Sequence, residues 1–160
     1  MDKQRKFPIY VILENIRSAF NVGAIFRTSD AVGIKKLYLT GITPYPPHNK
    51  IPKTALGATK TVKWKYEKNI YNVIEKLKKQ NVKVIGVEIT PNAQIYTDTH
   101  YENPVALILG NEIHGIESKT LNLCDKIVKI PMFGSKKSLN VEVSYAIVVY
   151  EIIRQYLNEK

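Results

Sequence analysis

Short apolar runs alternate with helical patterns along most of the chain. Apolar runs typical of buried strands cover residues 9–13, 36–40, 61–64, 82–87, 105–109 and 126–130, the third being the weakest. Helical patterns separate several of them. Strands that alternate with helices predict an α/β fold, with a mostly parallel sheet flanked by helices.

Two of the predicted helices have clear sequence signals at their ends or along one face. The first is expected over residues 22–32, with Asn21 as its N-cap and Gly33 just beyond its last turn. The second is expected over residues 69–80, and its apolar positions share one face: Ile70, Val73, Ile74 and Leu77. A short helix is also expected over residues 117–123.

Residues 43–60 interrupt this alternation. The segment is rich in proline and is expected to be an irregular loop of unusual length. Its lysines are suited to holding a phosphate backbone, and a solvated surface loop is an equally good interpretation.

The last predicted helix, residues 139–157, is apolar over much of its circumference. One apolar stripe contains Leu139, Val143, Ala146, Ile147, Tyr150 and Ile153. A neighbouring stripe contains Val141, Tyr145, Val148, Val149, Ile152 and Tyr156. The sheet can cover only one of these faces, so the other predicts a homodimer with this helix in the interface.

Composition narrows the class of protein. The 160 residues suit a single domain over residues 1–160, and 44% hydrophobic with 24% charged residues is ordinary for a globular protein. No apolar run approaches the length of a membrane span, and the polar start of the chain has no signal-peptide pattern. A single cysteine, Cys124, excludes an internal disulfide framework, so a reducing cytoplasm is the expected location.

Charge points to a polyanionic partner. Lys and Arg number 24 against 14 Asp and Glu, which gives a net charge of +10. Nucleic acid is the usual partner of so basic a domain.

Familiar catalytic patterns are absent from the sequence. The chain has no dinucleotide-binding glycine fingerprint, no P-loop and no nucleophile elbow. The histidines His48, His100 and His114 are scattered without the spacing of metal ligands, so no metal site is expected.

Polar residues instead gather at three places where predicted strands end. The first stretch runs from Glu14 through Asn21 to Thr28, the second over residues 109–115, and the third over residues 130–141. Ligands of open α/β sheets bind beyond the carboxyl ends of the strands, so these stretches are expected to converge on one site. Each residue alone also has a purely structural interpretation, as a helix cap or a turn.

In order and spacing, the three stretches resemble the motifs of the SpoU/TrmH family of RNA ribose 2′-O-methyltransferases. The first matches N-x(5)-R-T at Asn21 and Arg27-Thr28, and the second matches G-x-E-x-x-G at Gly110, Glu112 and Gly115. The third matches I-P-M and S-L-N-V at residues 130–132 and 138–141. The likeness covers nearly the whole chain and departs from the family at Glu142, where relatives often have a small polar residue.

The resemblance implies a catalytic domain without a separate N-terminal RNA-binding domain. It implies a deep trefoil knot at the C-terminal end of the sheet, an exception to the rule that chains do not thread their own loops. S-adenosylmethionine would bind in that knot, in a homodimer. By motif position, the residues implied to bind it are Val87, Gly110, Ile130, Met132 and Leu139.

The resemblance also implies roles for catalytic and RNA-binding residues. The implied catalytic set is Arg27, Asn21, Glu112, Ser138 and Asn140. The basic residues beside the site loops are then expected to contact RNA: Arg17, Lys50, Lys53, Lys60, Lys136 and Lys137. Two other functions are considered: an RNA-binding or ribosome-assembly protein that kept the fold without catalysis, and a methyltransferase acting on small molecules.

Overall fold

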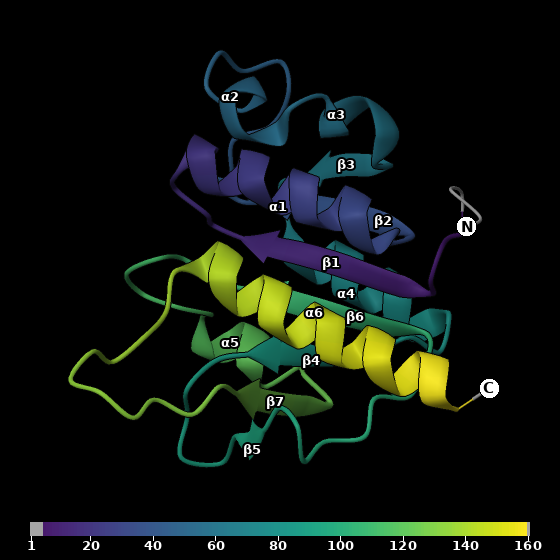
Figure 1. Ribbon diagram of the computed structural model, residues 1–160, viewed down its shortest axis with the longest axis vertical. Coiled ribbons are helices and arrows are strands. Elements are labelled where there is room, and N and C mark those ends of the chain that lie inside the picture. The colour runs from purple at the N-terminus through teal and green to yellow at the C-terminus, as the bar shows by residue number, and fades with distance from the viewer. Residues whose placement is uncertain (1–4, 160) are drawn as a thin grey trace.

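A computed structural model describes residues 5–159 and shows one seven-stranded sheet (Figure 1). The strands are β1 (Ile9–Glu14), β2 (Lys36–Thr40), β3 (Trp64–Glu67), β4 (Lys83–Val87), β5 (Gln94–Ile95), β6 (Val105–Leu109) and β7 (Lys126–Lys129). Their order is β3-β2-β1-β6-β4-β7-β5, and every ladder is parallel. The predicted α/β class with a mostly parallel sheet is confirmed.

Helices cover both faces of this sheet. They are α1 (Ala19–Val32), α2 (Pro52–Ala55), α3 (Ala58–Thr61), α4 (Ile70–Lys79), α5 (Ser118–Leu121) and α6 (Val141–Asn158). In Figure 1, α1 and α6 lie in front of the sheet, while α4 and α5 lie behind it. One apolar core therefore lies on each face, and β6, buried at all five positions, separates them near the middle of the sheet.

Helix α1 begins earlier than the sequence pattern predicts. Its N-cap is Ser18, whose hydroxyl accepts a hydrogen bond from the backbone N–H of Asn21 at 3.2 Å. The prediction that Asn21 is the N-cap is therefore wrong, and this leaves the Asn21 side chain available for other contacts. The other end is as predicted, because Gly33 adopts the left-handed conformation (φ 78°) just past the helix.

The segment around residues 43–60 is more regular than expected. It contains α2 and α3, because Ile51, Ala55 and Ala58 are buried in the core shared with α1 and give two short helices an apolar anchor. The strand predicted over residues 61–64 is displaced toward the C-terminus, since Thr61 ends α3 and β3 starts at Trp64. Helix α4 matches its prediction, with Asn69 as N-cap and the four named apolar residues buried.

Helix α6 begins at Val141, because Asn140 is its N-cap and accepts hydrogen bonds from the N–H groups of Glu142 and Val143. Its two apolar stripes differ in burial. Tyr145, Val148, Val149 and Ile152 are buried against the sheet and α1. On the other stripe, Val143 (40% exposed) and Tyr150 (51% exposed) face outward.

Three expectations are not tested by this architecture. The trefoil knot stays a prediction, because strand order does not establish threading. The single-domain assignment over residues 1–160 also stays a prediction. The polar start of the chain falls partly on residues 1–4, which lie outside the described residues.

Candidate active site

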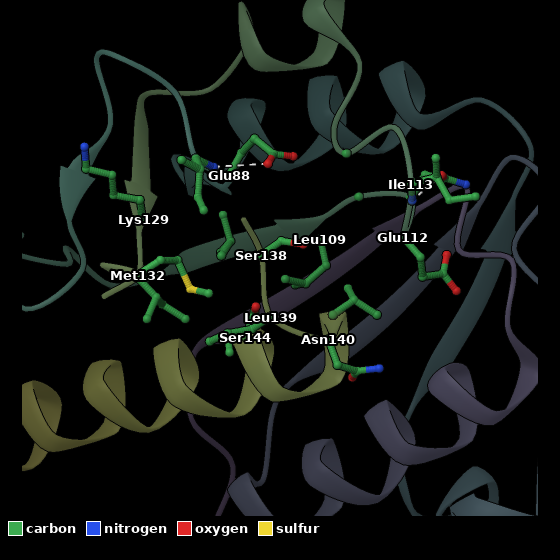
Figure 2. Close-up of a pocket in the computed structure, with 17 residues that line it drawn as sticks. Glu88, Leu109, Glu112, Ile113, Lys129, Met132, Ser138, Leu139, Asn140 and Ser144 are labelled. Atoms are coloured by element: carbon green, nitrogen blue, oxygen red, sulfur yellow. Dashed lines mark hydrogen bonds between the residues drawn. The ribbon is translucent and has the colours of Figure 1, made fainter. Parts of the chain in front are cut away.

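A pocket lies over the carboxyl ends of β4, β6 and β7, beside the first turn of α6 (Figure 2). Its lining residues are Val87, Glu88, Ile89, Leu109, Gly110, Asn111, Glu112, Ile113, Gly115, Lys129, Ile130, Met132, Ser138, Leu139, Asn140, Val141 and Ser144. The second and third polar stretches therefore do converge, as expected for the edge of a parallel α/β sheet.

All the residues expected to bind the cofactor line this pocket. They are Val87, Gly110, Ile130, Met132 and Leu139. Figure 2 shows Met132 and Leu139, from the segment between β7 and α6, near Leu109 at the end of β6. The walls thus combine apolar side chains with polar groups from three loops, as small-molecule sites commonly do.

Glu112 fastens the β6–α5 loop to the start of α1. Its carboxylate accepts hydrogen bonds from the backbone N–H groups of Arg17 and Ser18, both at 2.8 Å. Partial burial acts to raise the pKa of Glu112, but these two hydrogen bonds and one from Asn21 outweigh it and lower that pKa. The carboxylate is therefore ionised near neutral pH at the helix N-terminus, where negative charge is favoured.

Asn21 connects this carboxylate to the third polar stretch. Its amide donates to Glu112 Oε2 at 3.1 Å, and its carbonyl Oδ1 accepts from Asn140 Nδ2 at 3.1 Å. Asn140 in turn caps α6 through its own Oδ1. One chain of hydrogen bonds therefore joins all three polar stretches at the mouth of the pocket.

Arg27 is placed differently from the other four residues of the implied catalytic set. Glu112, Ser138 and Asn140 line the pocket, and Asn21 bonds to two of them. Arg27 lies on the exposed side of α1 and does not line the pocket of its own chain. Its neighbour Thr28 donates a hydrogen bond to Glu142 at 2.6 Å, so this part of α1 packs beside the start of α6.

The residues expected to contact RNA are all exposed: Arg17, Lys50, Lys53, Lys60, Lys136 and Lys137. Arg17 lies just before the N-cap of α1, and its backbone N–H donates to Glu112. Lys136 and Lys137 come directly before Ser138, which lines the pocket. Lys50, Lys53 and Lys60 lie on the segment that carries α2 and α3, which packs against α1.

Sequence reasoning missed Glu88 and gave no role to Glu14, which it named only as the start of the first polar stretch. Glu88 lines the pocket and accepts a hydrogen bond from the backbone N–H of Ile116 at 2.9 Å, which holds the turn after Gly115. Glu14 is buried at the end of β1 and accepts from Thr120 Oγ1 and from the N–H of Glu117, while burial raises its pKa. The position of Glu88 directly after β4 was the signal that could have identified it.

The residues that line the pocket suit a cationic, nucleoside-like cofactor. Apolar side chains such as Leu109 and Ile130 can pack against a flat base, and the carboxylate of Glu88 in the same lining favours positive charge. Among residues 5–159, no three His, Cys, Asp or Glu side chains are grouped in a way that could hold a metal ion.

Three known proteins that this chain resembles all modify RNA. The tRNA (guanosine(18)-2'-O)-methyltransferase of Escherichia coli K12 is 31% identical over 155 residues, which cover 97% of this chain and 67% of that protein. The 23S rRNA (guanosine-2'-O-)-methyltransferase RlmB of Neisseria meningitidis is 32% identical, over 96% of this chain and 62% of that protein. The crystal structure of the Aquifex aeolicus TrmH/SpoU tRNA modifying enzyme superimposes with a TM-score of 0.86 at 27% identity, covering 98% of this chain and 79% of that one.

The parallel sheet with a pocket at its carboxyl edge is an α/β enzyme architecture, and it superimposes on the TrmH/SpoU structure described above. The chain belongs to the SpoU rRNA methylase family, whose model matches residues 8–150. Members of this family are RNA ribose 2′-O-methyltransferases, and S-adenosylmethionine is their methyl donor. No helix among the described residues is long and apolar enough to cross a membrane.

Proposed function

We propose that this chain transfers a methyl group from S-adenosylmethionine to a ribose 2′-hydroxyl of tRNA or rRNA. The observation that carries the proposal is the hydrogen-bonded chain Glu112–Asn21–Asn140, which joins the three motif segments at the mouth of one pocket. The names of the relatives, which act on tRNA and on 23S rRNA, support the substrate class. The cytoplasm, where these RNAs are modified, is the proposed location.

The pocket residues would bind and orient the cofactor. Val87, Gly110, Ile130, Met132 and Leu139 form its walls, and Glu112 keeps the β6–α5 loop fixed against α1. When bound, S-adenosylmethionine supplies an electrophilic methyl group on a positively charged sulfur. Holding this group in line with the 2′-oxygen is the main task of the protein, and good alignment can remove about 7–11 kcal/mol of a barrier.

Ser138 and Asn140 would position the ribose hydroxyl, because both line the pocket close to the start of α6. Arg27 would bind the neighbouring phosphate and polarise the hydroxyl as its oxygen forms the new bond to carbon. A guanidinium group stays protonated in proteins, so Arg27 acts through its positive charge rather than as a base. The hydroxyl proton would then leave through a phosphate oxygen of the RNA.

A homodimer through α6 would bring Arg27 to the pocket of a second copy. The exposed stripe of Val143, Tyr150 and Leu157 repeats every seven residues along α6, a spacing that keeps the three on one face. Arg27 lies outside the pocket of its own chain, on the helix packed beside α6. Both observations support an active site completed by the partner subunit.

The positive residues around the pocket would contact the RNA backbone. They are the exposed set Arg17, Lys50, Lys53, Lys60, Lys136 and Lys137. Contacts of this kind increase affinity without reading sequence, and they weaken as salt concentration rises.

Transfer of radiolabelled methyl groups from S-adenosylmethionine to total tRNA, and separately to deproteinised rRNA, tests this function. Nucleoside analysis should recover the label as a 2′-O-methylnucleoside from one of the two pools. An RNA-binding or assembly protein without catalysis would bind RNA and transfer no label to either pool. Label recovered on a base, or on small molecules alone, would also overturn the proposal.

A further inference from the structure

Four lysines gather on the face of the sheet that α4 covers, toward the edge strand β3 and away from the pocket. This lysine cluster consists of Lys36, which starts β2, Lys63 and Lys65 at β3, and Lys76 on α4. Lys65 pairs in register with Tyr38 of β2, and the carbonyl of Lys63 accepts a hydrogen bond from Leu37 at 2.9 Å. Pairing of the two strands therefore fixes three of the four lysines close together.

Lys36 lies within range of the positive charges of the other three lysines. Burial lowers the pKa of Lys36, and the charges of Lys76, Lys63 and Lys65 lower it further. The ammonium of Lys36 lies 5.1 Å from the centre of the Tyr38 ring, and Lys35 lies 5.6 Å from the Tyr10 ring. These buried rings hold both lysines at the surface by cation–π contact.

No acidic side chain neutralises the cluster within residues 5–159. The ion pairs there are Lys79–Glu75, His100–Glu159 and Arg154–Glu151, and none includes a cluster lysine. Glu67 is on the same strand as Lys65 but lines a hollow at the carboxyl end of β3. Like charges held together without counter-charges lower stability, so their concentration here favours an anionic partner.

We propose that the lysine cluster binds the phosphate backbone of the RNA substrate at a second place, separate from the pocket. This inference rests on the proposed function, because that function makes RNA the anionic partner. Across the sheet, β2 and β4 are three strand spacings apart, about 14 Å, and the amino end of β2, where Lys36 lies, is a further four residues or about 13 Å along the strand from its carboxyl end. A folded RNA is large enough to reach both places. None of the four lysines lines the pocket, so the cluster contributes to RNA affinity without taking part in methyl transfer.

The double variant Lys63→Gln, Lys65→Gln tests this directly, because both side chains are exposed and their loss should leave the fold intact. The matched control is Lys83→Gln, Lys126→Gln, which removes the same charge from the starts of β4 and β7. Filter binding of total tRNA and of deproteinised rRNA, without cofactor, is measured against KCl concentration. Methyl transfer is measured in parallel to obtain KM for RNA and kcat.

We expect the cluster variant to lose affinity about tenfold more than the control. The slope of log affinity against log salt should fall by roughly 1–2, as expected when one or two phosphate contacts are lost. The KM for RNA should rise, while kcat and the affinity for S-adenosylmethionine stay unchanged. Lys76→Gln, on a different element, should shift binding in the same direction.

Equal binding and equal salt slopes in the cluster variant and the control would overturn the lysine cluster as an RNA site. A fall in kcat with an unchanged KM would overturn it as well. Failure of the proposed function is distinguishable, because RNA binding is measured without methyl transfer. If the wild-type chain transfers no methyl group, the proposed activity is overturned. If the Lys63→Gln, Lys65→Gln variant then still loses more RNA affinity than the control, the cluster is supported as an RNA site.

Discussion

Asn21 donates a hydrogen bond to Glu112 at 3.1 Å although the two residues are 91 positions apart in the sequence. Through this bond, the first turn of α1 and the loop after β6 form one unit at the mouth of the pocket. Because Asn21 also accepts from Asn140, the start of α6 belongs to the same unit. The spacing of the pocket walls therefore depends on side chains that need not touch the cofactor.

Replacing Glu112 with Gln should destabilise the fold and remove part of its acid sensitivity. The amide offers one acceptor oxygen where the carboxylate offers two, so one of its three donors loses its partner. The loss should be on the order of 1 kcal/mol, a low value because the group is partly exposed to water. Urea unfolding of both proteins between pH 3 and pH 7 measures it.

The sign of this pH dependence follows from the lowered pKa of Glu112 in the folded state. Its stabilisation is fully present above the unfolded carboxyl value of about 4.3, and it is lost as pH falls through the folded pKa. The stability difference between wild type and Glu112→Gln should thus be constant near neutral pH and shrink in acid. A difference that does not change from pH 7 to pH 3 would contradict an ionised Glu112.

The sequence predicted most of the sheet because its strands are buried apolar runs, and Val105–Leu109 and Lys36–Thr40 match at both ends. It misplaced the start of α1, because Ser18 and Asn21 are both good caps and the hydrogen bonds of Ser18 and Asn21 to the distant Glu112 cannot be read from the sequence. The helices between residues 52 and 61 were missed because burial against α1, rather than their own sequence, stabilises them.

The residues of the candidate site also fall into those that the sequence predicted and those that it did not. The resemblance to the family motifs implied site roles for Gly110, Ser138 and Asn140, and all three line the pocket. The roles of Glu88 and Glu14 were not predicted, because their partners, Ile116 and Thr120, become neighbours only when the loops pack together. Contacts between distant segments carry no local pattern in one sequence.

Gly110→Ala should abolish binding of S-adenosylmethionine while leaving most of the fold intact. A Cβ at this position would lie 2.4 Å from the carbonyl carbon of Gly115 and from the nitrogen of Ile116. These are backbone atoms of the pocket wall and cannot move aside without shifting the turn. Gly134→Ala is the matched control, since its Cβ would meet nothing within 4 Å. Calorimetric titration with the cofactor compares the two, and equal affinities would contradict this account of the loop.

Tyr150→Glu should convert the proposed dimer to a monomer. Tyr150 is 51% exposed at the middle of the apolar stripe on α6, so a charge there would be buried in the interface without a partner. The control is Ile42→Glu, which places the same charge at a 66% exposed apolar residue in the turn after β2. Analytical ultracentrifugation should show a monomer for the first variant only. A monomeric wild-type protein would exclude the interface.

Arg27→Ala and Asn140→Ala should each reduce methyl transfer by at least a hundredfold. A mixed dimer of one Arg27→Ala chain and one Asn140→Ala chain should regain part of the activity. If Arg27 acts on the pocket of the partner subunit, a mixed dimer has one site with both residues intact and one site with neither. Co-expression with two different tags and purification of the mixed dimer should give up to half the wild-type kcat. The Arg27→Ala homodimer should still bind S-adenosylmethionine, because Arg27 does not line the pocket. A mixed dimer as inactive as its parents would mean that Arg27 serves the pocket of its own chain. An Arg27→Ala homodimer with full activity would mean that Arg27 has no role in transfer.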